Sequence, residues 1–389
     1  MMLAIKGGKI LTITKGEIEN GVILIENGKI VNVGAKVAVP EGAEVIDATG
    51  KVIMPGLVEA QCHVGIVEES IGWAGADSDE TTDPVTPQMR ALDGIKANAD
   101  EGGLRAALET GVTTVQILPG SGNVLAGSGV IIKTAPKPVA DEMVLKNPSG
   151  MKVSLGDSPR NVYGQTQRKM PSTRMGVAYL LRDQLLKAQS YINKKESAKD
   201  DPKKMPDRDL KLEALEPVLK GEIPLLVHAH RADDIAAAIR VAEEFGVKIV
   251  WHHGTEGHRI AELIAKKKIP TVHGPATRSG SWETREMDFK TAKTLHDAGV
   301  KIAITTDATS QSIRLIPLWA ALYVKNGLPR DVVLKAVTIS PAEILGVADR
   351  VGSIEKGKDA DLRILSGDPL DIKTKVEMVL VDGKVLYKA

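Results

Sequence analysis

Short apolar, β-branched runs bounded by turn residues fill both ends of the chain. They cover Met2–Ile5, Val22–Ile25 and Lys29–Val33 near the start, and Asp361–Leu365 and Val376–Leu380 near the end. The pairs Asn27-Gly28 and Asp382-Gly383 between such runs are typical of tight β-hairpins. We therefore predict that residues 1–51 and 350–389 pair into one small β-sandwich domain.

Residues 52–349 alternate strand-like apolar runs with helical segments, which is typical of βα units around a parallel sheet. The predicted strands are Val52–Ala60, Val112–Leu118, Val130–Thr134, Met151–Leu155, Pro224–His230, Val247–His253, Pro270–Pro275 and Val300–Asp307, with Val139–Leu145 competing for the third place. Eight such units, without a Gly-rich dinucleotide-binding motif, favour an α/β fold of the (β/α)8 TIM barrel type.

Composition narrows the classes of partner. The 389 residues include 51 basic and 50 acidic side chains, a net charge of +1 that lacks the strong positive field of nucleic-acid-binding proteins. No apolar run is long enough to cross a bilayer, and no secretory leader is recognisable. The single cysteine, Cys62, fits a reducing compartment. We expect a cytoplasmic protein that acts on a small molecule and binds neither nucleic acid nor membrane.

Histidine and aspartate residues gather where the predicted strands end. The first strand leads into Gln61-Cys62-His63, the fifth ends at His228 and His230, the sixth at His252 and His253, the seventh at His273 and the eighth at Asp307. A single histidine in a strand more often has a structural role. Because barrel active sites form at the carboxyl ends of the strands, we expect these side chains to converge. Imidazole and carboxylate ligands with an open position for water suit a catalytic divalent metal.

The segments around these residues resemble the amidohydrolase superfamily, and within it the imidazolonepropionase-like branch. The resemblance runs in order through Met54–His63, Val227–His230, His253–His258, Thr305–Asp307, Ser340–Ala342 and Gly352–Leu362. It implies a hydrolase that uses a metal-activated water to cleave a C–N bond in an amide or cyclic amide, or an ester bond. Relatives of this kind are often dimers or larger, so the resemblance leaves a homo-oligomer open.

The same resemblance implies roles for individual residues. His63, His228, His253 and Asp307 would hold a single Zn²⁺ or Fe²⁺ ion, and Asp307 would also serve as general acid and base. His230, His252 and His273 complete the predicted catalytic set, with His230 orienting the substrate or its oxyanion, or supporting a metal ligand.

Four positions depart from the family pattern. Gln61 replaces the first histidine of an expected His-x-His pair, and an amide is a weaker zinc ligand than imidazole. His252 stands where a glutamate is expected, His273 where an aliphatic residue is expected, and Ala308 follows Asp307 in place of histidine. Because these changes gather at the predicted active-site end of the barrel, they favour a redesigned, active-site-altered amidohydrolase with weakened or lost metal binding.

An altered site opens two alternatives. One is a metal-free esterase in which Cys62, Ser128 or Ser310 is the nucleophile, His252 or His273 the base and Asp307 the orienting carboxylate. The plainer interpretations are a small buried residue for Cys62, a loop residue for Ser128 and a helix N-cap for Ser310. The other alternative is a catalytically inactive binding scaffold.

Lys152 in the predicted fourth strand is a further candidate. Some amidohydrolases carry a carboxylated lysine at this place that bridges two metals, whereas the plainer interpretation is a solvated lysine. With Gln61 in the first strand, we expect one metal ion or none more than two.

Overall fold

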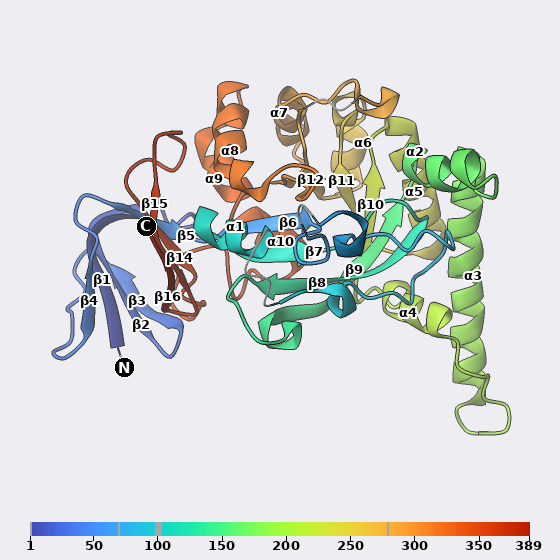
Figure 1. Ribbon diagram of the computed structural model, residues 1–389, viewed down its shortest axis with the longest axis horizontal. Helices are drawn as coiled ribbons and strands as arrows, with labels where there is room; N and C mark the ends of the chain where they lie inside the picture. The colour runs from blue at the N-terminus through green and yellow to red at the C-terminus, as the bar shows by residue number, and fades with distance from the viewer. Residues whose placement is uncertain (1, 69–70, 98–102, 278–279) are drawn as a thin grey trace.

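The computed structural model describes residues 2–68, 71–97, 103–277 and 280–389, and two β-sheets organise it. Figure 1 shows the sheet that contains both chain ends at one end of the molecule and the larger, helix-covered sheet beside it. The long helix α3 (Arg174–Ala198) lies at the opposite end from the chain termini (Figure 1). The metal-binding candidates all belong to the larger sheet and its loops.

The first sheet joins the two ends of the chain. Its strands are β1 (Met2–Leu11), β2 (Glu17–Glu26), β3 (Lys29–Gly34), β4 (Glu44–Asp47), β5 (Val52–Pro55), β14 (Leu362–Leu365), β15 (Val376–Val381) and β16 (Lys384–Lys388). They follow the order β16-β15-β14-β5-β1-β2-β3, with β4 paired to β1, so the antiparallel β5–β14 pair is the joint. The predicted hairpin turns are confirmed, since Asn27 and Asp382 have φ values of 49° and 48°. We call this the terminal sheet.

The predicted first barrel strand, Val52–Ala60, is divided between the two sheets. Residues Val52–Pro55 form β5 of the terminal sheet, and β6 (Leu57–Cys62) begins the barrel. Gly56 stands at the switch, where an added Cβ would lie 2.0 Å from Thr113 Oγ1. A larger residue at position 56 would therefore clash with the side chain of Thr113. The domain boundaries at residues 51 and 350 remain a prediction.

The second sheet confirms the predicted eight barrel strands. They are β6, β7 (Val112–Ile117), β8 (Leu125–Lys133), β9 (Val144–Ser154), β10 (Leu225–Ala229), β11 (Ile249–His253), β12 (Thr271–His273) and β13 (Ile302–Ile304), hydrogen-bonded in this order. A parallel bridge between Cys62 and Ala308 brings the first and last strands together. The sheet is thus a nearly closed barrel.

The strand directions differ from the prediction at one place. The pairs β7–β8 and β8–β9 are antiparallel, while the other neighbours are parallel. Residues 118–124 and 134–143 are the only links between these strands, and a parallel crossover needs roughly a dozen residues or more. The third unit of the barrel is therefore a pair of hairpins without a covering α-helix.

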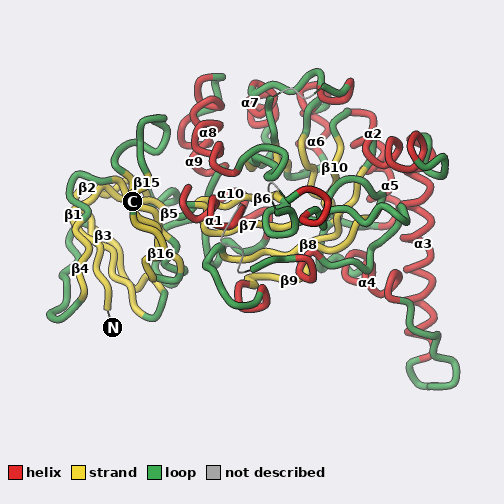
Figure 2. Tube along the Cα trace, viewed as in Figure 1, coloured by secondary structure: helices red, strands yellow, loops and turns green. Residues whose placement is uncertain are grey.

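Helices cover the outside of the barrel, as the red segments around the yellow strands in Figure 2 show. Besides α3 they are α1 (Gly103–Thr110), α2 (Asp157–Arg160), α4 (Leu210–Leu219), α5 (Ala232–Phe245), α6 (Ala261–Lys266), α7 (Lys290–Asp297), α8 (Ile316–Lys325), α9 (Arg330–Ala336) and α10 (Ile339–Leu345). Within the described ranges, no helix has the length and apolarity needed to span a membrane. Cytoplasmic location remains a prediction.

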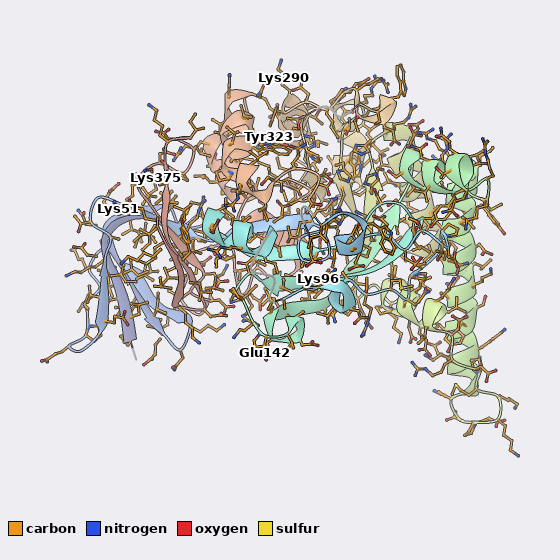
Figure 3. The ribbon with its side chains drawn as sticks, in the orientation of Figure 1. Lys51, Lys96, Glu142, Lys290, Tyr323 and Lys375 are labelled. Atoms are coloured by element: carbon orange, nitrogen blue, oxygen red, sulfur yellow. The ribbon has the colours of Figure 1, made fainter. Side chains whose placement is uncertain are left out.

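The alternation of side chains along the strands separates two apolar cores. Leu226, Val250 and Val272 belong to a cluster enclosed by the barrel, whereas Leu225 and Trp251 belong to the larger cluster beneath the helices. Residues two positions beyond the inner set consequently point into the barrel as well. Charged side chains such as Glu142, Lys290 and Lys375 lie exposed on different parts of the outer surface (Figure 3).

Candidate metal centre

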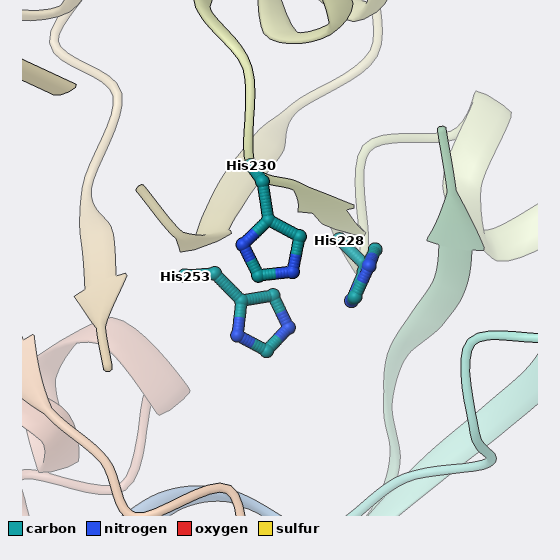
Figure 4. Close-up of side chains that lie close together, drawn as sticks. All are labelled: His228, His230 and His253. Atoms are coloured by element: carbon teal, nitrogen blue, oxygen red, sulfur yellow. The ribbon is translucent and has the colours of Figure 1, made fainter. Parts of the chain in front are cut away.

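Three histidines meet inside the mouth of the barrel. His228 and His230 lie two and four residues beyond the inward-facing Leu226, at the end of β10. His253 comes from the end of the neighbouring strand β11. One ligand atom from each ring lies within 4.8 Å of the others, and Figure 4 shows the three rings around a common space. We call these residues the histidine cluster.

The rings of the cluster are packed against one another and buried. The His230 and His253 rings are stacked with centroids 4.7 Å apart, and the His228 ring meets His253 edge-on at 4.3 Å. Burial, and the neighbouring histidines, hold the pKa values of His228 and His230 well below the usual range, and burial lowers that of His253 to about 4. All three rings are therefore neutral at physiological pH, as metal ligands must be.

Hydrogen bonds hold the Nδ1 atoms of two rings of the cluster. His253 Nδ1 donates to the Gly274 carbonyl at 2.8 Å, because a carbonyl oxygen only accepts. His230 Nδ1 lies 2.8 Å from the Thr255 hydroxyl oxygen. His253 Nε2 therefore carries a lone pair, which faces Gln61 Nε2 at 3.2 Å. His230 Nε2 carries a lone pair when Nδ1 of that ring is the donor. Such outer partners orient metal-binding histidines in known sites.

Asp307 lies beside the cluster, just beyond β13. Its Oδ1 is 3.5 Å from His63 Nε2, and its Oδ2 accepts a hydrogen bond from Ser310 Oγ at 2.8 Å. Burial alone would raise the pKa of Asp307, but contact with His63 and the nearby His253 hold this pKa well below its usual range. The carboxylate is therefore ionised at physiological pH.

Gln61 connects Asp307 to the histidine cluster. Its side-chain Nε2 lies 2.6 Å from Asp307 Oδ1 and 3.2 Å from His253 Nε2, and the side chain is completely buried. His63, two residues further along, donates from Nδ1 to the Leu118 carbonyl at 2.7 Å. The predicted ligands His63 and Asp307 thus form a second group next to the three clustered histidines.

The residues present fit a divalent metal. Some of the buried polar atoms without a protein partner belong to residues at the barrel mouth: Gln61 Oε1, Lys152 Nζ, Ser154 Oγ, His228 Nε2 and both ring nitrogens of His252. A buried polar atom without a partner costs about 1–3 kcal/mol. A metal ion on neutral imidazoles satisfies the orphaned nitrogen of His228, and it matches the ligand preference of zinc and iron.

Comparison with known proteins identifies the family. A family model described as the amidohydrolase family matches residues 213–387. The crystal structure of an amidohydrolase from Thermotoga maritima MSB8 superposes with a TM-score of 0.95 and 41% sequence identity, covering 100% of both chains. The chain belongs to the amidohydrolase superfamily. The resemblance predicted from the sequence motifs is confirmed.

Curated relatives of this amidohydrolase are more distant in sequence. The amidohydrolase tasK of Hapsidospora irregularis is 28% identical over 94% of the chain, but the chain spans only 40% of the length of that protein. An imidazolonepropionase of Thermoplasma acidophilum is 26% identical over 95% of the chain and 90% of the relative. None of these comparisons supports the predicted redesign of the active site.

The structure does not bring His273 to the histidine cluster of this amidohydrolase. Its neighbour Val272 points into the barrel, so His273 faces outward, and its ring centroid lies 5.7 Å from that of Tyr323 in α8. His273 Nδ1 donates to the His253 carbonyl at 2.8 Å. This hydrogen bond of His273 thus supports the backbone of His253, a residue of the histidine cluster. His252 is buried in the barrel without a hydrogen-bond partner.

The three alternative nucleophiles have no imidazole partner in the described part of the chain. Cys62 Sγ donates to the Gln116 carbonyl at 3.4 Å, and burial raises the pKa of this thiol well above its usual range. Ser128 Oγ faces the Met89 carbonyl at 3.5 Å. Ser310 donates to Asp307 and so supports that carboxylate. The predicted metal-free site needs a histidine base within hydrogen-bond reach of the nucleophile, and no hydrogen bond between such a pair is present among the described residues.

Two buried residues near the barrel mouth differ from what the sequence predicted or were not predicted at all. The plainer interpretation of Lys152 as a solvated lysine is wrong, because its side chain is fully buried and its Nζ has no partner. Burial lowers the pKa of this amine. Carboxylation of Lys152 remains a prediction from the resemblance. Glu59, which the sequence interpretation did not single out, is completely buried on β6 and accepts hydrogen bonds from Thr306.

Proposed function

We propose that this protein is a metal-dependent hydrolase that cleaves the C–N bond of an amide or cyclic amide, or an ester bond. The observation that carries the proposal is the group of three neutral histidines next to the ionised carboxylate of Asp307. His228, His230 and His253 would hold a single Zn²⁺ or Fe²⁺ ion, with His63 beside them. Homologues named amidohydrolase and imidazolonepropionase support the reaction class.

A divalent metal at such a site lowers the pKa of water and polarises the carbonyl that is attacked. Asp307 accepts the proton of the attacking water and returns it to the departing nitrogen or oxygen. Ser310 and Gln61 each hold one oxygen of Asp307, at 2.8 Å and 2.6 Å, so the carboxylate keeps one orientation during this transfer. The rings of the histidine cluster are neutral, so their lone pairs are available to a metal ion.

The test combines metal content with turnover. Elemental mass spectrometry of the purified protein should find about one equivalent of zinc or iron per chain. Dialysis against a chelator should remove the ion together with hydrolysis of a panel of amides, cyclic amides and esters, and adding Zn²⁺ or Fe²⁺ back should restore it. Turnover that persists after complete removal of the metal would contradict the proposal.

A further inference from the structure

Away from the histidine cluster, two buried carboxylates from different loops border one small space. Asp234 lies in the first turn of α5, and Glu283 lies in the one-turn helix η6 (Trp282–Thr284) of the loop after β12. The two residues are only 2% and 4% exposed. A Cβ added at Gly156, which follows β9, would lie 3.0 Å from Asp234 Oδ2 and 2.2 Å from Glu283 Oε1. The glycine therefore leaves open a space that both carboxylates face.

Arg174, at the start of α3, neutralises these carboxylates in part. Its Nε donates to Asp234 Oδ1 at 2.8 Å, and its Nη2 donates to Asp157 Oδ1 at 3.1 Å. The same Nη2 lies 3.6 Å from Glu283 Oε1, which accepts the backbone N–H of Asp157 at 2.8 Å. Asp234 Oδ2 is buried and has no hydrogen-bond partner. The open oxygen of Asp234 is thus the one beside Gly156.

The charges around this space do not balance. Three carboxylates and two guanidinium groups meet here: Asp157, Asp234, Glu283, Arg160 and Arg174. The neighbouring Asp233 and Arg231 pair with each other at 2.9 Å and cancel. One negative charge is left over, and a buried charge without a partner is costly. Burial raises the pKa of Asp234, and it raises that of Glu283 to about 7, as expected where positive charge is lacking.

Oxygen ligands and a single missing positive charge favour a monovalent cation. Carboxylate oxygens suit hard cations, and Ca²⁺ takes about six to eight such ligands. Within the described ranges, the histidine cluster is the only group of three acidic, histidine or cysteine side chains whose ligand atoms meet, so a divalent cage is lacking at Gly156. We propose that Asp234 Oδ2 and the Glu283 carboxylate bind a Na⁺ or K⁺ ion beside Gly156.

The ion joins three loops at the carboxyl ends of the barrel strands. Gly156 follows β9, Asp234 follows β10 and Glu283 follows β12. Helices α2 and α5 contact α3 on this flank of the barrel (Figure 1). Loops at this end of a barrel surround the active-site mouth, so the ion stabilises the rim of that mouth. The inference is independent of the proposed function, because it involves no ligand of the catalytic ion.

The experiment compares monovalent cations on the zinc-loaded protein. Melting temperatures are measured at about pH 8 in choline chloride, NaCl and KCl of equal ionic strength, since Glu283, with a pKa of about 7, is then ionised. Choline is too bulky for the space beside Gly156. The melting temperature should be roughly 2–4 °C higher in NaCl or KCl than in choline chloride. The gain should level off as the concentration of the preferred ion rises, because a single site saturates.

Three variants assign the effect to this space. Asp234→Asn removes the charge of the unpartnered oxygen and should abolish the difference between the salts. Glu283→Gln should do the same from the other loop, and it covers a failure of Asp234→Asn to fold, which circular dichroism would reveal. Glu244→Gln, exposed near the far end of α5, removes an equal charge elsewhere and should keep the difference.

Two results would overturn the inference. One is an equal melting temperature of the wild type in the three salts, which would leave a proton or water beside Gly156. The other is a difference between the salts that persists in a folded Asp234→Asn or Glu283→Gln variant.

Discussion

Two residues of the site adopt backbone conformations that side chains usually avoid. His253 and Asp307 have φ values of 76° and 53°, in the left-handed region. Each such residue costs on the order of 1–3 kcal/mol and persists where the surrounding structure imposes it. The turn at His253 releases its side chain from the strict alternation of β11, so that His253 as well as the buried His252 borders the barrel mouth.

This local turn explains what the sequence could and could not predict about the site. The ends of β10, β11 and β13 were predictable from apolar runs, and so was the gathering of His228, His253 and Asp307. The sequence also predicted His273 there, because alternation within the short strand β12 could not be placed in register. The Gln61 contacts depend on a register shift between Glu59 and Cys62 that no pattern announces.

Asp307→Asn should lower kcat by about 10²- to 10⁴-fold, the usual contribution of a general acid–base group. The amide cannot accept the proton of the attacking water, while its size leaves the fold intact. Steady-state kinetics on a substrate found in the panel, with circular dichroism as a check of folding, measure the effect.

Ser310→Ala is the matched control, since Ser310 holds Asp307 Oδ2 without replacing the carboxylate. We expect this variant to lose less activity than Asp307→Asn. Near-normal kcat in Asp307→Asn would rule out the acid–base role of that residue.

At the scale of elements, Glu59 closes the barrel. This residue of β6 accepts hydrogen bonds from Thr305 and Thr306, which follow β13 at the other edge of the sheet. The Thr305 hydroxyl oxygen also lies 2.9 Å from the Gln61 carbonyl oxygen. Burial raises the pKa of Glu59 to about 7, against the hydrogen bonds, which lower it. The joint between the first and last strands therefore carries a titrating group.

Glu59 should make stability depend on pH. Its pKa is 4.5 when exposed and about 7 in the fold, so between these values the folded chain keeps a proton that the unfolded chain releases. The protonated Glu59 therefore contributes about 3 kcal/mol to the free energy of unfolding below pH 4.5. This contribution is lost as pH rises to 7. Denaturant unfolding of wild type and Glu59→Gln between pH 5 and 8 measures it.

The difference between the two proteins is the quantity of interest, because other acids titrate in both. The free energy of unfolding of wild type should fall relative to Glu59→Gln as pH rises. Two curves that run parallel across this range would refute the assignment of a raised pKa to Glu59.

The arrangement of elements was predictable to the level of strand count and order along the chain. Eight apolar runs predicted eight barrel strands, and hairpin signals predicted the terminal strands. The direction of β8 was missed because β8 is buried on both faces and so reads as a continuous apolar run, as a parallel strand does. The division between β5 and β6 was missed because Val52–Ala60 is mostly apolar. Only Pro55-Gly56 and Glu59 interrupt the run.

At the scale of the whole molecule, one buried lysine joins the barrel to the terminal sheet. Lys133, at the end of β8, contacts Asp359 at 2.6 Å, Asp361 at 3.2 Å and Asp382. Asp359 is almost completely buried and is also bound by Arg350 at 2.7 Å. The carboxylates belong to the segment that enters β14 and to the β15–β16 turn. The charges therefore hold the two sheets in a fixed relation.

Lys133→Met should destabilise the protein by about 3–5 kcal/mol, because it leaves the buried carboxylate of Asp361 without its counter-charge. Guanidinium unfolding monitored by tryptophan fluorescence measures the change. Lys384→Met, on the exposed strand β16, replaces a surface lysine and should change stability by less than about 0.5 kcal/mol. Equal effects of the two substitutions would show that the Lys133 contacts contribute no net stability.

The pairing of β5 with β14 has a consequence for synthesis on the ribosome. These neighbours in the terminal sheet are separated by residues 56–361 of the chain. At about 5–20 residues per second, translation needs roughly 15–60 s to supply β14 after β5 has been made. During that interval the nascent β5 exposes an unpaired strand edge, which is a site for wrong pairing between chains. The rate of translation through the barrel thus sets how long each new molecule is open to aggregation.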